Sequence, residues 1–405
     1  MLNELPLICI LAGLVAYAVL AGADFGAGIW TLLSERGATR LRAHARHAMG
    51  PVWEANHVWL IFVLVVGWTA YPEAIASIAS TLTVPLFVAA IGIILRGTAY
   101  ALRAQSESGV VAAWIERVFG VSSILTPFAL GAAIGGIASG RVPVGNASGD
   151  LITSWLNPTG VAIGVLSVAT SAYLASVYLA ADANRLREPD LVRSFRTRAL
   201  VTGIVAGALA LAALLTVRSD AKPIWEGLRE GWGLLALGAS GLGGVATLVL
   251  VRGRRFEPAR VAAALAVAAV VAGWAVAQNP VLLPGLTIDE AAAGHTTIVA
   301  LLVSVAVGAI VLFPALGFLF TLVLRGRFDP GRAAVAPVLW TPRAALRLSP
   351  RLVAAGVCFV VGASLTVLID STWGLALGVV VLLAAPTVAF APLAAPPATQ
   401  ERNGG

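Results

Sequence analysis

The chain has 405 residues, of which 59% are hydrophobic and only 12% are charged. Soluble domains carry about 25% charged residues, so this composition leaves too little polar surface to cover a globule in water. It excludes an ordinary soluble domain and predicts a protein whose main solvent is lipid.

The apolar segments have the length of membrane-spanning helices, which need about 20 predominantly apolar residues. Nine such stretches precede residue 326, at 6–33, 52–71, 75–102, 118–139, 159–181, 199–217, 232–251, 261–277 and 296–324. Two shorter candidates follow, at 352–369 and 373–394. We predict an all-α fold, a polytopic transmembrane helix bundle with nine core helices and a C-terminal two-helix hairpin.

The loops divide the chain into three predicted parts. Residues 325–351 are rich in arginine and proline and separate the nine-helix core from the hairpin. We expect a transmembrane domain over 1–325, and a cytosolic linker with an extra transmembrane hairpin over 326–395. The polar end of the chain, 396–405, has the composition of a disordered tail.

The net charge of +7 follows a topological pattern. Arginines gather in every second loop, at 36–46, 103–117, 185–198, 252–260 and 325–351. The basic residues that we place on the other side are Arg141, Arg218, Lys222 and Arg229. Cytoplasmic loops carry an excess of Lys and Arg, so we predict an external N-terminus and a cytosolic C-terminus. The pattern requires an odd number of spans and argues against a nucleic-acid partner.

Ionisable groups inside a membrane cost about 2.5–3.5 kcal/mol each at a helix centre, and here they gather in the first three spans. Asp24 lies in the first span, between Gly22 and Gly26, which allow another helix to approach closely. One interpretation is a proton-relay carboxyl packed inside the bundle. The alternative is an acid that only pairs with an arginine for structure.

A second acid, Glu54, stands in the segment PVWEANHVWL, which we expect to open the second helix with Pro51 in its first turn. A carboxyl at this cytosolic end can take up protons toward Asp24, or can simply complement the helix dipole. Asn56 and His57 add polar groups. His57 can shuttle protons near neutral pH, or can be a surface histidine at a helix end.

Arg96 and Arg103 are seven residues apart on the third span and therefore share a face. Arg103 can extend to the cytosol. Arg96 lies about 10 Å deeper and requires a partner, for which Asp24 or Glu54 is the candidate. Tyr100 stands between the two arginines. The aromatic residues of these spans fit interfacial belts: Trp53, Trp59, Trp68 and Tyr71.

The four histidines show neither the spacing of a metal site nor an obvious pair of haem ligands. They are His44, His47, His57 and His295. We expect His44 and His47 to be solvated in a basic loop.

These motifs together resemble the second subunit of the cytochrome bd quinol oxidases. GADFGAGI is similar to the family signature Asp-Gly-Phe-Asp-x-Gly-x-Gly, with Asp24 at the second Asp and Ala21 in place of the first. PVWEANHVWL is similar to Trp-Asp-Gly-Asn-x-Val-Trp-Leu, with Glu54 where the family commonly has Asp. Arg96 and Arg103 match the family's third-helix arginines. The resemblance runs from residue 1 to about 325 and is most specific over the first 105 residues.

The resemblance implies a heterodimer in the bacterial plasma membrane that oxidises quinol and reduces dioxygen to water. A haem-binding subunit I would hold the haems and most of the quinol site. Both subunits would be surrounded by membrane lipid, which also contains the quinone. This chain would support assembly and supply a cytosolic proton path. The implied path residues are Asp24, Glu54, Asn56 and His57, and the supporting ones are Arg96, Arg103, Tyr100, Trp53 and Trp59.

Two other functions stay open at this point. A proton-coupled secondary transporter also uses an intramembrane acid, but it predicts broken helices at corresponding positions of both halves. A non-catalytic membrane scaffold requires no titrating group at all.

Overall fold

The computed structural model describes residues 2–34, 39–103, 109–324 and 350–368, with a few positions between 373 and 384. Inside its helices, the structure does not describe the side chains of Thr39, residues 46–55 and Arg103, nor those of several residues in α12 and α13. The predicted linker, most of the second hairpin helix and the predicted tail also fall outside the described residues. The chain divides into two compact units, residues 1–320 and 321–405.

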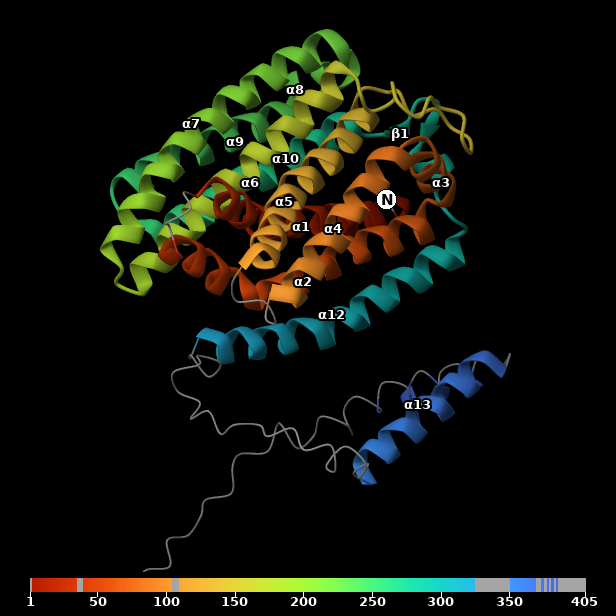
Figure 1. Ribbon diagram of the computed structural model, residues 1–405. Coiled ribbons are helices and arrows are strands. Elements are labelled where there is room, and N and C mark those ends of the chain that lie inside the picture. The colour runs from red at the N-terminus through yellow and green to blue at the C-terminus, as the bar shows by residue number, and fades with distance from the viewer. Residues whose placement is uncertain are drawn as a thin grey trace, which may run out of the picture. The chain divides into compact units, whose positions relative to one another are not determined.

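The described residues are almost entirely helical (Figure 1). The helices are η1 (Leu2–Glu4), α1 (Leu5–Leu33), α2 (Thr39–Ala70), α3 (Pro72–Thr81), α4 (Thr83–Arg103), α5 (Gly109–Ala138), α6 (Pro158–Arg185), α7 (Pro189–Asp220), α8 (Lys222–Arg229), α9 (Gly231–Arg252), α10 (Phe256–Gln278), α11 (Ile288–Ala291), α12 (His295–Leu324) and α13 (Pro350–Leu368). A short antiparallel hairpin pairs β1 (Val281–Leu283) with β2 (Leu286–Thr287).

Eight of the described helices are long and apolar enough to cross a membrane, and Asn56–Ala70 within α2 is a shorter apolar helix. Together they correspond to the nine predicted stretches. The prediction of an all-α transmembrane bundle is confirmed.

Several boundaries differ from the prediction. The stretch 75–102 is two helices, α3 and α4, which meet at Leu82. Pro85 explains the break, because it offers no N–H to the carbonyl four residues earlier and disfavours a continuous helix there. Helix α8 lies between the predicted stretches 199–217 and 232–251, and α7 starts ten residues before the first of these.

The start of the second span was also wrong. Helix α2 begins at Thr39, so Pro51 and Glu54 lie within a long helix and do not open it. The basic segment before Pro51 is helical because its alanine, arginine and leucine residues have high helix propensity.

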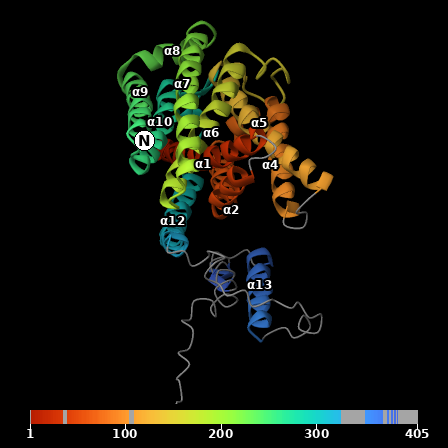
Figure 2. The same cartoon turned by 60° about the vertical axis from the view of Figure 1, so that its left-hand side comes forward.

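Eight long helices of residues 1–320 form two neighbouring groups, α1, α2, α4 and α5 in one and α6, α7, α9 and α10 in the other, and α12 belongs to neither. Helix α1 packs against α2, α5, α6 and α10, so it joins the two groups. Figure 2 shows α4 and α5 on one side of α1, and α9 and α10 on the other. A functional group on the inner face of α1 is therefore shielded by helices of both groups.

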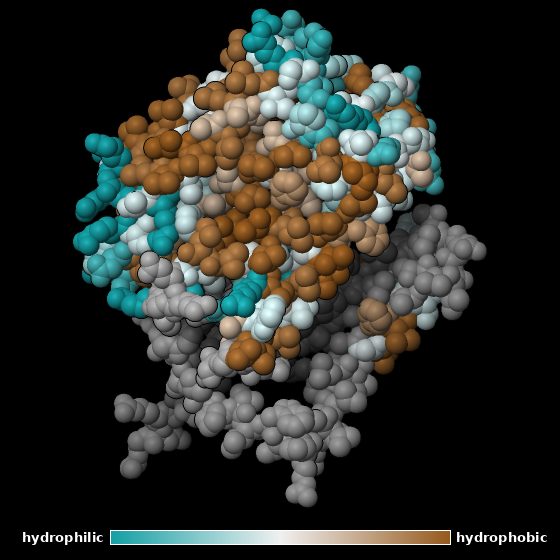
Figure 3. Space-filling view, turned by 45° about the horizontal axis from the view of Figure 1, so that its top comes forward, coloured by the Kyte–Doolittle hydropathy of each residue, from teal (hydrophilic) through white to brown (hydrophobic). Residues whose placement is uncertain are grey.

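The close approach of α1 to α6 depends on glycine. A Cβ at Gly26 would come 1.9 Å from the carbonyl oxygen of Ser171, which no side chain can occupy. The outer faces of the helices are apolar instead, and Figure 3 shows a broad hydrophobic band with hydrophilic residues gathered at its margins. Such a surface matches a hydrocarbon solvent.

Candidate functional site

A buried ion pair joins α1 to α4. Arg96 Nη2 lies 2.6 Å from Asp24 Oδ1 and also donates to the carbonyl oxygen of Asp24 at 2.8 Å. The two side chains are 0% and 4% exposed. Of the two acids considered for Arg96, the structure places Asp24 beside it. Mutual attraction and hydrogen bonding offset the desolvation cost of placing both charges in the bundle.

The guanidinium of Arg96 is enclosed by a third helix. Its Nη1 donates to Ser123 Oγ on α5, and its Cζ lies 5.0 Å and 4.2 Å from the ring centroids of Phe25 and Phe119. Both rings are within the range of a cation–π interaction. Gly28 makes room for the contact, because a Cβ there would lie 2.7 Å from Arg96 Nη1. One arginine therefore ties α1, α4 and α5 together.

Polar groups of α2 complete the surroundings of the carboxylate. Asn56 is fully buried, and its Nδ2 donates to the carbonyl oxygen of Leu20 at 3.4 Å. The amide of Asn56 and the imidazole of His57 both lie near the Asp24 carboxylate. The His57 ring is half-buried, and its centroid lies 6.4 Å from that of Tyr17. The predicted residues Asp24, Asn56 and His57 therefore meet beside Arg96.

Three residues around the Asp24–Arg96 pair were not predicted from the sequence: Tyr17, Ser123 and Phe119. Ser123 was detectable in principle, because the run Ser122-Ser123 with Thr126 places hydroxyls inside an apolar span. All three hydroxyl residues are buried. Aromatic residues such as Phe119 carry no such signal, since they are common in any transmembrane core.

The remaining predicted residues lie further out or beyond the described side chains. Tyr100 is 37% exposed, one helical turn from Arg96. Trp59 packs against a small apolar cluster that includes Ala21 and Phe25. Ala21, which replaces the first acid of the family signature, is 1% exposed. The side chains of Trp53, Glu54 and Arg103 are outside the described part of the structure.

The expectation of a solvated His44 was wrong. His44 is buried, its Nε2 lies 3.1 Å from the carbonyl oxygen of Leu179, and its ring packs near Phe195. The physical reason is the long α2, which carries His44 into contact with α6. The side chain of His47 is outside the described part of the chain.

Two of the described histidines have the following surroundings. The Nε2 of His44 is engaged with a backbone carbonyl, and His295 is exposed at the first residue of α12. Within the described ranges, no group of three or more His, Cys, Asp or Glu side chains is arranged to hold a metal ion.

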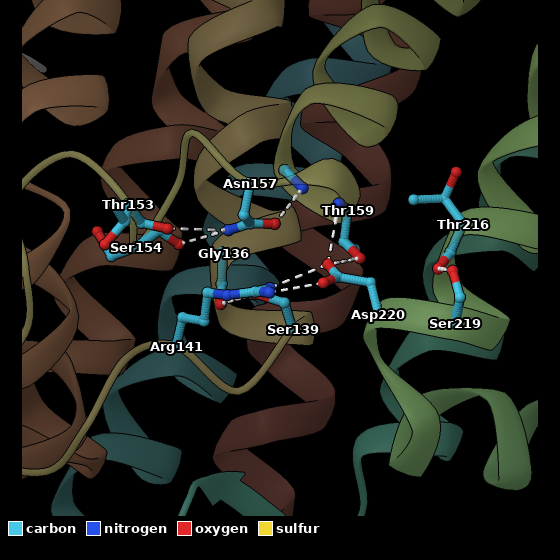
Figure 4. Close-up of polar contacts among 11 residues, drawn as sticks. Gly136, Ser139, Arg141, Thr153, Ser154, Asn157, Thr159, Thr216, Ser219 and Asp220 are labelled. Atoms are coloured by element: carbon cyan, nitrogen blue, oxygen red, sulfur yellow. Dashed lines mark hydrogen bonds and ion pairs between the residues drawn. The ribbon is translucent and has the colours of Figure 1, made fainter.

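A second polar cluster lies at the end of α7 (Figure 4). Arg141 and Asp220 form a bidentate pair, with Nη1–Oδ2 at 2.9 Å and Nη2–Oδ1 at 2.5 Å. Asp220 Oδ2 also accepts from the Thr159 hydroxyl at 2.6 Å and from its backbone N–H at 3.2 Å. Asn157 caps the start of α6 by accepting from Gly160 N–H at 2.8 Å. The cluster ties the α5–α6 loop to α7.

The family model for cytochrome bd terminal oxidase subunit II matches residues 2–323, which include the Asp24–Arg96 site and both helix groups. The chain belongs to the cytochrome bd terminal oxidase subunit II family. It is therefore a multi-pass membrane subunit of an oxidoreductase complex. Complexes of this family use haem and quinol, and a subunit II implies a partner subunit I.

Individual relatives agree with the family. A Bacillus subtilis (strain 168) protein provisionally named cytochrome bd menaquinol oxidase subunit II is 23% identical over 324 residues, covering 77% of this chain and 92% of the relative. Cytochrome bd ubiquinol oxidase subunit 2 of the same organism is 29% identical over 138 residues, covering 32% and 38%. In a solved bd oxidase from Geobacillus thermodenitrificans, a chain 25% identical to this one superimposes with a TM-score of 0.63, covering 80% of this chain and 98% of that one.

Proposed function

We propose that this subunit supplies a cytosolic proton path to haems held by the partner subunit I, and that it supports assembly of the complex that oxidises quinol and reduces dioxygen. One observation carries the proposal: a carboxylate, an arginine, an amide and an imidazole meet inside an otherwise apolar bundle. Intramembrane ionisable residues of this kind are expensive and mark functional sites.

The residues of the site have separable tasks in this proposal. Arg96 holds one oxygen of Asp24 and fixes the carboxylate between α1 and α4. Asn56 and His57 approach the same carboxylate from α2, the helix that also contains Glu54. Glu54 precedes His57 by three residues, a spacing that places two positions on neighbouring parts of one helical face. We assign proton uptake to Glu54 and transfer toward the partner to Asp24.

The proposal places the haems and most of the quinol site in the partner. It is supported by His44, whose Nε2 lies beside a backbone carbonyl oxygen, and by His295, which is exposed at a helix start. It also places the N-terminus outside and the C-terminus in the cytosol. The supporting observation is the set of arginines at the ends of α6 and α9 and the starts of α7 and α10, which the positive-inside rule assigns to the cytosol.

The experiment co-expresses the chain with its subunit I and measures quinol-driven oxygen consumption per haem. Asp24→Asn and Glu54→Gln remove the titrating groups with little change of shape, and we expect turnover to fall by about 10²-fold. Asp220→Asn is the matched control, because it removes the same charge at the distant cluster and should leave turnover per haem near wild type.

Dividing by haem content separates poor assembly from poor proton delivery. A proton-path role also predicts a larger solvent deuterium isotope effect in both variants. Unchanged turnover and an unchanged isotope effect in Asp24→Asn and Glu54→Gln would refute the path and would favour a scaffold role.

A further inference from the structure

The turn between α9 and α10 carries three cations without nearby anions. Arg252, Arg254 and Arg255 are exposed and stand within four residues. Where the structure describes side chains, no acid lies within ion-pairing distance of any of the three. The neighbouring acids are paired elsewhere: Glu257 lies 3.6 Å from Arg260, and Asp190 lies 4.0 Å from Arg193.

The backbone of this turn is fixed. Arg196 of α7 donates to the carbonyl oxygens of Val251 and Arg252, at 3.1 Å and 2.8 Å. The N–H of Arg255 bonds to the carbonyl oxygen of Leu250 at 2.8 Å, and Arg254 adopts a left-handed φ of 56°. The side chains of the three arginines therefore extend from a backbone that is held in place by hydrogen bonds. A fixed backbone lowers the entropy cost of holding a ligand.

An apolar groove of about 580 Å³ opens between the same two helices. Its walls include Ala239, Leu242 and Ala246 of α9, and Ala262, Leu265 and Ala272 of α10. The alanines leave space between α9 and α10 because they have no side chain beyond Cβ. Ala246 precedes Arg252 by six residues, so the groove begins about 9 Å along the helix from the arginines. The interfacial layer of a bilayer is about 5–7 Å thick on each side, which puts the groove at acyl-chain depth.

We propose that the α9–α10 hairpin binds an anionic phospholipid, with its phosphate at Arg252, Arg254 and Arg255 and one acyl chain in the groove. Guanidinium groups form forked hydrogen bonds with phosphate oxygens, and the surplus positive charge selects an anionic head group. The groove supplies a hydrocarbon surface below the phosphate, within the membrane-spanning part of both helices. Arginines that served only to orient the chain in the membrane would require no such groove.

The test uses the full chain in complex with its subunit I, purified in detergent and stripped of lipid. Phosphatidylglycerol or phosphatidylcholine is added back, and retained lipid is counted by native mass spectrometry. We expect wild type to retain phosphatidylglycerol about tenfold better than phosphatidylcholine, and R252Q/R254Q/R255Q to lose that preference. The matched control R218Q/K222Q/R229Q removes three charges elsewhere and should keep it.

A second variant keeps the proposal testable if the arginine variant fails to assemble. Ala246→Phe fills the groove, leaves the arginines intact, and should reduce phosphatidylglycerol retention. Excess inorganic phosphate should not displace the lipid, since it cannot use the groove. Equal retention of the two lipids by wild type, equal loss in both triple variants, or cross-linking of the groove to a partner protein would overturn the proposal.

Discussion

The molecule contains two arginine–aspartate pairs in very different surroundings. Arg96 and Asp24 are 0% and 4% exposed, whereas Arg141 and Asp220 are 37% and 13% exposed. Water reaches the second pair and screens it, but the first pair depends on protein groups alone. The same two side-chain types therefore form a functional candidate in one place and a structural tie in the other.

The partners of each pair reflect this difference. Asp220 accepts from Thr159 and so connects two helix ends through partly buried hydrogen bonds. Arg96 of α4 is held by Ser123 and Phe119 of α5 and by Phe25 of α1. The buried pair offers few alternative partners, so a change there has the larger consequence.

The largest expected effect follows from breaking the buried pair on one side. Arg96→Gln leaves the Asp24 carboxylate without its counter-charge, and we expect a loss of about 3–5 kcal/mol in unfolding free energy. Unfolding of the purified complex by titration with a denaturing detergent measures this loss. The double variant D24L/R96M removes both charges and should recover part of the stability. A double variant as unstable as the single one would contradict the role of an uncompensated charge.

A smaller effect is expected from crowding the same pair. Gly28→Ala introduces a Cβ 2.1 Å from Ser123 Oγ and should cost about 1–3 kcal/mol, because side chains around Arg96 must shift. Gly238→Ala is the control, since a Cβ there meets nothing within 4 Å. The same unfolding titration compares the two variants. Equal stability would show that the site has more room than the structure indicates.

Breaking the half-buried pair should matter less. Arg141→Gln is expected to cost about 1 kcal/mol or less, because water solvates the freed Asp220 carboxylate and Thr159 continues to donate to it. The loss should shrink further in high salt, whereas the effect of Arg96→Gln should not. Unfolding titrations at low and high ionic strength measure this contrast, and equal salt dependence of the two variants would contradict it.

The smallest effect lies in the short helix α11, which contains the exposed Glu290. Hydrogen bonds from the Thr287 hydroxyl and N–H lower the pKa of Glu290 below its ordinary value of 4.5. Its contribution to local stability is therefore present above pH 4.5 and is lost as pH falls through the lowered pKa. Hydrogen exchange of residues 286–291 should quicken at acid pH in wild type. It should be nearly independent of pH in Glu290→Gln once intrinsic exchange is corrected, and a retained pH dependence would implicate another group.

Much of the architecture was predictable because lipid imposes simple rules. Apolar stretches of helical length gave the spans, since every backbone polar group must be satisfied inside the membrane. The extended start of α2 was not predicted, because Pro51 suggested a helix start and tertiary contacts such as that of His44 with α6 overrode it. The division of residues 1–325 from the later part stays a prediction.

The sequence by itself determined which residues carry unusual cost: Asp24, Arg96, Asn56 and His57 are polar groups in apolar helices, and lipid makes them conspicuous. It did not decide how they pair, because Arg96 had two candidate acids, Asp24 and Glu54. Only the tertiary structure placed Arg96 on Asp24, through the glycine face that lets α1 approach its neighbours and the Ser123 hydroxyl of α5. Those contacts join residues distant in the chain, and their geometry depends on helix packing that no local pattern specifies.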